Sequence, residues 1–160
     1  MMLFHGSSQI VREPLILKPN RTLDYGVGFY TTTSEQQAFD WALRRSSQEE
    51  CGYVNIYVFD NVEAANLKRL DFPNPPGEGW VDFVYANRNQ IGFTHDNDLV
   101  YGPVANDRVY AAFALYEQGL LNKQELIAEL KTYSLIDQMV FHTKASLKCL
   151  KFIEAKEVRP

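Results

Sequence analysis

The sequence predicts a single α+β domain with a split or mixed β-sheet core and flanking helices. Two observations lead to this fold class. The chain has 160 residues, of which 46 % are hydrophobic, and this is the length and composition of one globular domain spanning residues 1–160. Its β-prone and helical segments follow one another irregularly, roughly six short strands with four or five helices, and not in the regular alternation of a doubly wound sheet.

The N-terminal half contains a short first strand, expected at residues 3–5, and two clearer elements. Ser34, followed three residues later by Gln37, has the spacing of a capping box and predicts a helix over about residues 35–45. Residues 53–59 form the clearest strand, and we expect it to be central because both of its faces are apolar or aromatic. The side chains expected on the inner face of the helix are Ala38, Trp41 and Ala42.

Caps and glycines delimit the C-terminal half. The run Pro-Asn-Pro-Pro-Gly makes residues 73–79 a loop. Asn106 starts a helix that runs to about Gln118, and Gly119 stands where a C′ glycine belongs. The remaining segments are strands at 67–72, 98–104, 138–142 and 151–158, and helices at 80–89, 122–132 and after Thr143.

Composition argues against several classes of partner. A net charge of −4 and a pI of about 5.4 disfavour strong binding to duplex nucleic acid, which needs a basic surface. No apolar run is long enough to cross a bilayer, and residues 1–5 are too short and uncharged for a signal peptide, so we expect a cytoplasmic protein without membrane contact. Cys51 and Cys149 form no Cys-x-x-Cys pair; a disulfide between them is possible by count alone, and two buried thiols are the expectation. No metal site is expected. The histidines His5, His95 and His142 do not have the spacing of metal ligands with one another or with either cysteine.

The first candidate site is Phe4-His5-Gly6-Ser7, at the end of the first predicted strand. The imidazole of His5 can donate or accept a hydrogen bond near neutral pH. Gly6 allows a ligand to approach the backbone closely, with Ser7 beside it. The alternative interpretation of His5 is a half-buried structural histidine.

The second candidate site is the segment Tyr25-Gly26-Val27-Gly28-Phe29-Tyr30-Thr31-Thr32. It lacks the third glycine of a dinucleotide fingerprint and leads toward a strand, and no Gly-Lys-Ser/Thr follows it as in a P-loop. The segment is either a turn with aromatic packing or a backbone cleft near Gly28, in which the Tyr30 ring can stack on a flat heterocycle.

Two further candidates lie in the C-terminal half. Gln138 opens an apolar strand, where it is either an ordinary strand-end residue or a partner for a sugar hydroxyl. Asn106 and Asp107 follow the segment Tyr101-Gly102-Pro103-Val104-Ala105 and are either helix caps or part of a ligand-binding loop.

Taken in chain order, these motifs resemble the ADP-ribosyltransferase superfamily. The likeness is to its diphtheria-toxin and poly(ADP-ribose)-polymerase-like branch, which places a His–Tyr–Glu triad on three separated strands. The chain also resembles an uncharacterised bacterial family grouped with that superfamily, through Asp-x-Gly-x-Gly-Phe-Tyr-Thr-Thr, Gly-Pro-Val-Ala-Asn-Asp and Gln-x-x-Phe. The resemblance covers roughly residues 3–153 and implies the split sheet core of these transferases.

The resemblance also implies roles for single residues toward NAD⁺. His5 would bond the adenosine ribose, and the Gly6 backbone would hold the nicotinamide carboxamide. Tyr30 would stack on the nicotinamide ring, with Tyr25 as a second aromatic. Gln138 stands where the family has its catalytic Glu.

A glutamine at that position keeps a hydrogen bond but removes the charge that stabilises an oxocarbenium-like transition state. Loss of such a group costs about 3–4 kcal/mol in activation free energy, or roughly 10²–10³ in rate. Asp107 and Asp137 are the nearest alternative acids by motif.

Three functions therefore stay open. The first is a mono-ADP-ribosyltransferase, a toxin or regulator that uses NAD⁺ and modifies an unknown macromolecular acceptor. The second is an NAD⁺- or ADP-ribose-binding module without catalysis. The third is an RNA 2′-phosphotransferase-like enzyme, which the acidic balance of the chain disfavours.

Overall fold

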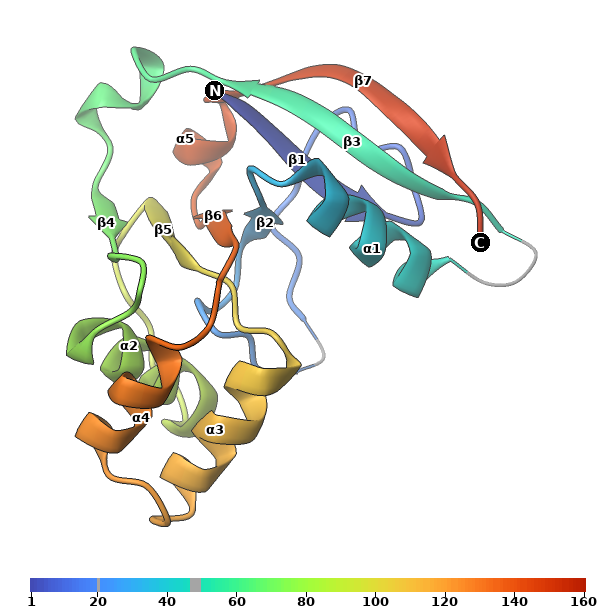
Figure 1. The fold of residues 1–160 in the computed structure, drawn as a ribbon. Helices are drawn as coiled ribbons and strands as arrows, with labels where there is room; N and C mark the ends of the chain where they lie inside the picture. Colours follow the sequence, from blue (N-terminus) through green and yellow to red (C-terminus); the bar gives the residue numbers. More distant parts are fainter. Residues whose placement is uncertain (20, 47–49) are drawn as a thin grey trace.

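The computed structural model describes residues 1–19, 21–46 and 50–160, which fold into two β-sheets with surrounding helices (Figure 1). The strands are β1 (Met2–Ser7), β2 (Phe29–Thr31), β3 (Gly52–Phe59), β4 (Arg69–Asp71), β5 (Leu99–Pro103), β6 (Asp137–Phe141) and β7 (Leu150–Val158). The helices are α1 (Glu35–Arg45), α2 (Glu78–Asn89), α3 (Asp107–Glu117), α4 (Lys123–Leu130) and α5 (Lys144–Leu147), with a 3₁₀ helix at Glu63–Asn66.

The β structure is split into two sheets. The first is antiparallel, with the order β1-β3-β7, and the second has the order β2-β6-β5-β4 and is mixed because β4 and β5 run parallel. The predicted α+β class with a split, mixed sheet is confirmed, as is the central place of β3. The sheets meet where Phe4 of β1 and Thr32, just after β2, exchange backbone hydrogen bonds of 2.8 and 2.9 Å.

The fold has four layers: α1, the first sheet, the second sheet, and the helices α2, α3 and α4. A cluster of buried side chains lies between each pair of successive layers. Helix α1 packs on the outer face of the first sheet, over Val54 and Ile56 of β3. A second cluster lies between the sheets and includes Leu3 of the first and Phe141 of the second. The largest cluster, around Trp80, lies between the other face of the second sheet and the helices α2, α3 and α4, which gather at one end of the molecule (Figure 1).

Local signals explain where most helices begin and end. The Ser34 side chain accepts a hydrogen bond from the Gln37 amide at the start of α1, and Asn122 and Glu125 form a complete capping box at the start of α4. Gly119 follows α3 with a φ of 78°, the left-handed conformation that glycine adopts at little cost. The 3₁₀ helix carries no strong sequence signal and was not expected.

Two expectations about burial need correction. Ala38 and Ala42 are fully buried on α1, but Trp41 is only half-buried, because it lies at the edge of the contact between α1 and β1. Both cysteines are free thiols; Cys149 is buried as expected, whereas Cys51 is half-buried beside Glu157 at the sheet edge. Among the described residues, no helix combines the length and apolar character that a membrane span requires.

Candidate functional site

The residues of the first two motifs meet at the junction of the two sheets, which we define by His5, Gly6 and Tyr30. The His5 Nδ1 atom lies 2.7 Å from the backbone carbonyl oxygen of Tyr30, across 25 positions of sequence. His5 projects between the sheets, where its ring packs on Phe29 with a centroid distance of 4.3 Å. The fold therefore brings together the early His-Gly motif and the glycine-rich segment.

Burial at the junction controls the charge of His5. Desolvation lowers the pKa of this imidazole from 6.5 to about 4, against the raising effect of its hydrogen bond to Tyr30, with a smaller lowering contribution from Arg45. His5 is therefore neutral at pH 7. Because Nδ1 faces a carbonyl oxygen, it carries the proton, and Nε2 is left as an acceptor.

Gly6 presents its backbone to the open edge of β1. Along an antiparallel strand, successive residues direct their backbone groups to opposite edges. Phe4 bonds to Thr32 and not to β3, so Gly6, two residues later, also faces away from β3. The Gly6 carbonyl oxygen accepts a hydrogen bond of 2.5 Å from Arg45 Nη1, and the described residues show no acceptor for its N–H.

A side chain at Gly6 would collide with α1. A Cβ atom there would lie 2.1 Å from the Ala38 carbonyl oxygen and 2.9 Å from the Cβ of Trp41. The glycine is thus needed for the close packing of α1 on β1, whether or not a ligand uses the backbone edge. This packing brings the Cβ atom of Trp41 close to Gly6; the Trp41 side chain is half-buried and stacks on no other aromatic ring among the described residues.

The glycine-rich segment is held by its own side chains. The Tyr30 hydroxyl donates to the Gly26 carbonyl oxygen at 2.7 Å and accepts from the Tyr25 amide at 3.1 Å. Gly26 has a φ of 85°, and a Cβ at Gly28 would lie 2.7 Å from Val140 Cγ1. Both glycines are thus needed for structural reasons. The half-buried Tyr30 ring packs against the cluster beneath the helices, on the face of the second sheet that also carries Val140, and only the backbone carbonyl of Tyr30 reaches His5 at the junction.

Tyr25 belongs to the core beneath the helices. Its side chain is fully buried, and its hydroxyl donates to the Pro103 carbonyl oxygen and accepts from Trp80 Nε1, both at 2.9 Å. A ring enclosed in this way supports the segment and offers no face to a ligand.

Gln138 and Asp137 are neighbours in sequence but lie on opposite faces of β6. Gln138 shares the helix-covered face with Val140, is 4 % exposed, and donates weakly from Nε2 to the Pro103 carbonyl oxygen at 3.4 Å. Asp137 shares the face toward the first sheet with Met139. The amide position that the resemblance highlights is therefore enclosed, and the carboxylate beside it is accessible.

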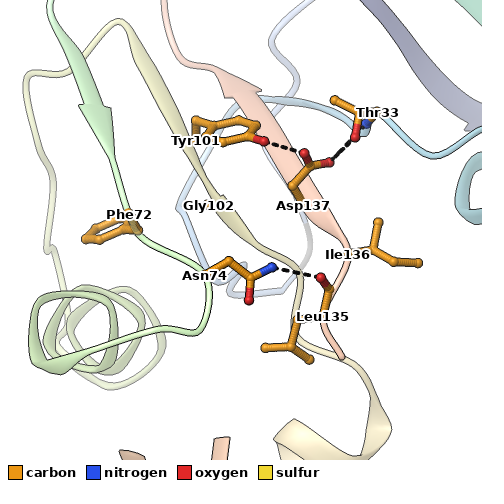
Figure 2. Close-up of a pocket in the computed structure, with 8 residues that line it drawn as sticks. All are labelled: Thr33, Phe72, Asn74, Tyr101, Gly102, Leu135, Ile136 and Asp137. Atoms are coloured by element: carbon orange, nitrogen blue, oxygen red, sulfur yellow. Dashed lines mark hydrogen bonds between the residues drawn. The ribbon is translucent and has the colours of Figure 1, made fainter. Parts of the chain in front are cut away.

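Asp137, the first residue of β6, lines a cavity of about 310 Å³ (Figure 2). Its carboxylate accepts a hydrogen bond from Tyr101 and another, of 2.5 Å, from the Thr33 hydroxyl. Desolvation and the hydrogen bond to Asp137 raise the pKa of Tyr101 to about 12, so this hydroxyl stays protonated as the donor. The lining residues are Thr33, Phe72, Asn74, Tyr101, Gly102, Leu135, Ile136 and Asp137.

Comparison with known proteins assigns the chain to a family. A family model described as a protein of unknown function (DUF3990) matches residues 1–152. The chain belongs to this family. No curated protein and no solved structure matches it.

The remaining predicted residues of this DUF3990 chain lie away from the junction or have local roles. Asn106 caps α3 by accepting from the Val109 amide at 3.0 Å, and it lines a second cavity of about 50 Å³ with Gln37, Val104, Ser134 and Ile136. Asp107 is exposed in the first turn of α3 and has no recorded hydrogen bond to His5 or Tyr30 within the described residues. Ser7 ends β1, and its hydroxyl accepts from the Gln9 amide at 3.2 Å.

Sequence reasoning missed several residues of both sites. In the sequence, Arg45 is a basic residue near the end of a predicted helix and carries no signal of a site. Only the packing of α1 on β1 brings its guanidinium to Gly6. Thr33, Tyr101 and Asn74 come from separate segments and form no motif. Over residues 1–19, 21–46 and 50–160, no three His, Cys, Asp or Glu side chains are grouped so as to hold a metal ion.

Proposed function

We propose that this DUF3990 chain is an NAD⁺-dependent ADP-ribosyltransferase-like domain that binds NAD⁺ at the junction of the two sheets. The observation that carries the proposal is the meeting of His5 and Tyr30 beside the open backbone edge of Gly6. These residues stand in the order that the ADP-ribosyltransferase resemblance requires.

The junction has chemistry that suits the nicotinamide end of NAD⁺. A carboxamide needs one acceptor and one donor, and the Gly6 edge offers an N–H and a carbonyl oxygen with a second lone pair. Trp41, whose Cβ atom lies close to Gly6, would provide a half-buried ring for a flat heterocycle, whereas the Tyr30 ring packs toward the helices on the other face of the second sheet. Arg45 adds a cation beside Gly6, which suits the diphosphate.

The reaction would break the bond between the nicotinamide nitrogen and C1′ of the ribose. The electron pair goes to the ring nitrogen and neutralises its positive charge, and a nucleophile of the acceptor attacks C1′ and loses a proton. His5 is neutral at pH 7, because its pKa is lowered to about 4, so it serves as a hydrogen-bond partner to ribose through Nε2 and not as a cation.

The environment of Gln138 favours a second candidate, a module that binds NAD⁺ without turning it over well. The side chain is 4 % exposed and donates a weak hydrogen bond to the Pro103 carbonyl oxygen; as a neutral amide it supplies no charge to the developing sugar cation. Turnover would then require an acid from elsewhere, because Asp137, the accessible carboxylate closest in sequence, faces a separate cavity on the opposite face of β6.

Free nicotinamide released from NAD⁺ by the purified chain is the measurement that tests the proposal. We expect release by the wild type and a decrease to background in His5→Ala. His95→Ala is the matched control, because His95 Nε2 bonds the backbone carbonyl of Tyr25 in the same segment, at 3.2 Å, but lies outside the junction. Its release should stay within about twofold of the wild type, since no contact to ligand is lost.

The thermal shift caused by NAD⁺ separates the two candidates. Stabilisation by NAD⁺ without nicotinamide release, together with gain of release in Gln138→Glu, would identify the binding module. Neither release nor stabilisation, or equal release by His5→Ala and the wild type, would contradict both.

A further inference from the structure

The cavity around Asp137 lies at the start of β6, beside Tyr101 and Gly102 of β5 and the segment that follows β4. Thr33 lines the cavity and follows the Phe4–Thr32 bridge directly, whereas Tyr30 lies on the other side of the bridge, about 10 Å away along the strand. The cavity and the junction are therefore separate sites.

Asp137 has hydrogen bonds but no cation. Thr33 donates to Oδ1 from both its hydroxyl and its amide, at 2.5 and 3.2 Å, and Tyr101 donates to Oδ2. Within the described part of the chain, Asp137 takes part in none of the ion pairs; Arg69, which lies over the Tyr101 ring at 5.6 Å, is bonded to Asp71. A half-buried carboxylate is thus held in a fixed orientation, with its charge unneutralised.

The other polar groups of the cavity are acceptors as well. The Thr33 and Tyr101 hydroxyls both donate their hydrogen bonds to Asp137, so their oxygen atoms can only accept a hydrogen bond from a ligand. Asn74 donates one Nδ2 proton to the Leu135 carbonyl oxygen at 2.8 Å, and its Oδ1 atom is an acceptor beside the remaining Nδ2 proton (Figure 2). The aromatic side chains of Phe72 and Tyr101 complete the lining. The carboxylate, the hydroxyl oxygens and the two aromatic rings favour a ligand that donates hydrogen bonds and carries a positive charge, of a size that fits about 310 Å³.

We propose that this cavity binds an organic cation, a guanidinium or primary ammonium group on a short stem, with Asp137 as its counter-ion. An anion would be repelled by the carboxylate, and a neutral polar group would leave the charge unpaired. The chemistry is that of an arginine or lysine side chain of a partner or of a small free amine. The proposal does not depend on NAD⁺ binding at the junction.

A titration of the ¹⁵N-labelled full chain, followed by two-dimensional NMR, tests the proposal. The probes are methylguanidinium, n-propylammonium and the neutral isostere N-methylurea. We expect saturable millimolar binding of both cations, with shifts centred on the Gly102 and Ile136 amides and the Asn74 side chain, and much weaker effects of N-methylurea. A short peptide with a central arginine then distinguishes the sources: binding of it indicates a protein side chain, and binding of the small cations alone indicates a free amine.

Two carboxylate variants provide the matched comparison. Asp137→Asn should weaken cation binding about tenfold or more, which is the effect of losing one charge-assisted hydrogen bond. Asp71→Asn removes an exposed carboxylate on the neighbouring β4 and should change the affinity by less than about twofold. Equal binding of N-methylurea and methylguanidinium by the wild type would overturn the proposal even if Asp137→Asn did not fold. Unchanged affinity in a folded Asp137→Asn, or shifts centred elsewhere, would overturn it too.

Discussion

At the scale of single residues, two glycines of this chain differ in whether the structure requires a residue without a side chain. Gly6 has no room for a side chain because the backbone of α1 lies against it, with the Ala38 carbonyl oxygen 2.1 Å from a Cβ atom. Gly79 lies in α2 with an ordinary backbone conformation, and a Cβ there would only touch Phe72 at 3.9 Å. One glycine is required by packing, and the other costs helix stability.

Alanine substitutions at these two positions should therefore have opposite effects. Gly6→Ala should lower the free energy of unfolding by about 3 kcal/mol, because α1 must move away from β1. Gly79→Ala should raise it by up to about 1 kcal/mol through helix propensity. Urea unfolding of both variants measures the difference. Equal stability of Gly6→Ala and the wild type would mean that α1 can shift at no cost.

At the scale of elements, the glycine-rich segment connects the sheet junction to the helices. Asp24 lies 3.6 Å from Arg88 of α2 and accepts from the Tyr110 hydroxyl of α3 at 3.1 Å. Tyr25 bonds Trp80 in the core, and His142 Nδ1 lies 2.7 Å from the Val27 carbonyl oxygen. The segment is thus held from several sides, which fixes the backbone of Tyr30 at the junction.

Removal of the Tyr25 hydroxyl should loosen this anchor. Tyr25→Phe leaves the buried Trp80 Nε1 without its acceptor and the Pro103 carbonyl oxygen with only the weak hydrogen bond from Gln138, and we expect a loss of about 2 kcal/mol in the free energy of unfolding. Tyr53→Phe is the matched control, since Tyr53 is half-buried and has no hydroxyl partner among the described residues; it should change stability by less than about 0.5 kcal/mol. Similar losses in both variants would speak against a special role of the Tyr25 hydroxyl.

At the scale of the whole molecule, two neutral histidines link the packing of the layers to pH. Desolvation lowers the pKa of both His5 and His142 from 6.5 to about 4, against the raising effect of a backbone hydrogen bond in each case. The unfolded chain therefore binds protons before the folded chain does. Asp24 has the opposite effect on the pH dependence of stability, because burial raises the pKa of its carboxyl despite the nearby Arg88, so that the folded chain binds this proton first.

We expect the free energy of unfolding to be maintained above about pH 6.5 and to fall as the pH decreases from 6.5 to 4. Urea unfolding at a series of pH values measures this dependence. His142→Asn keeps a donor for Val27 but no longer titrates, so its stability should depend less steeply on pH. Stability that stays constant or rises between pH 6.5 and 4.5 would show that these histidines do not control it.

Much of the fold was determined by the sequence itself, through interactions between near neighbours. The Ser34 cap and the apolar and aromatic residues at 53–59 predicted elements within a few residues of their observed bounds, because capping and burial patterns are local. Only the tertiary structure decided which side chains meet. It placed Gln138 in the core and Asp137 in a cavity, joined His5 to Tyr30, and brought Arg45 to Gly6. These contacts arise from the packing of two sheets and α1, and side chains many positions apart carry no local signal of that packing.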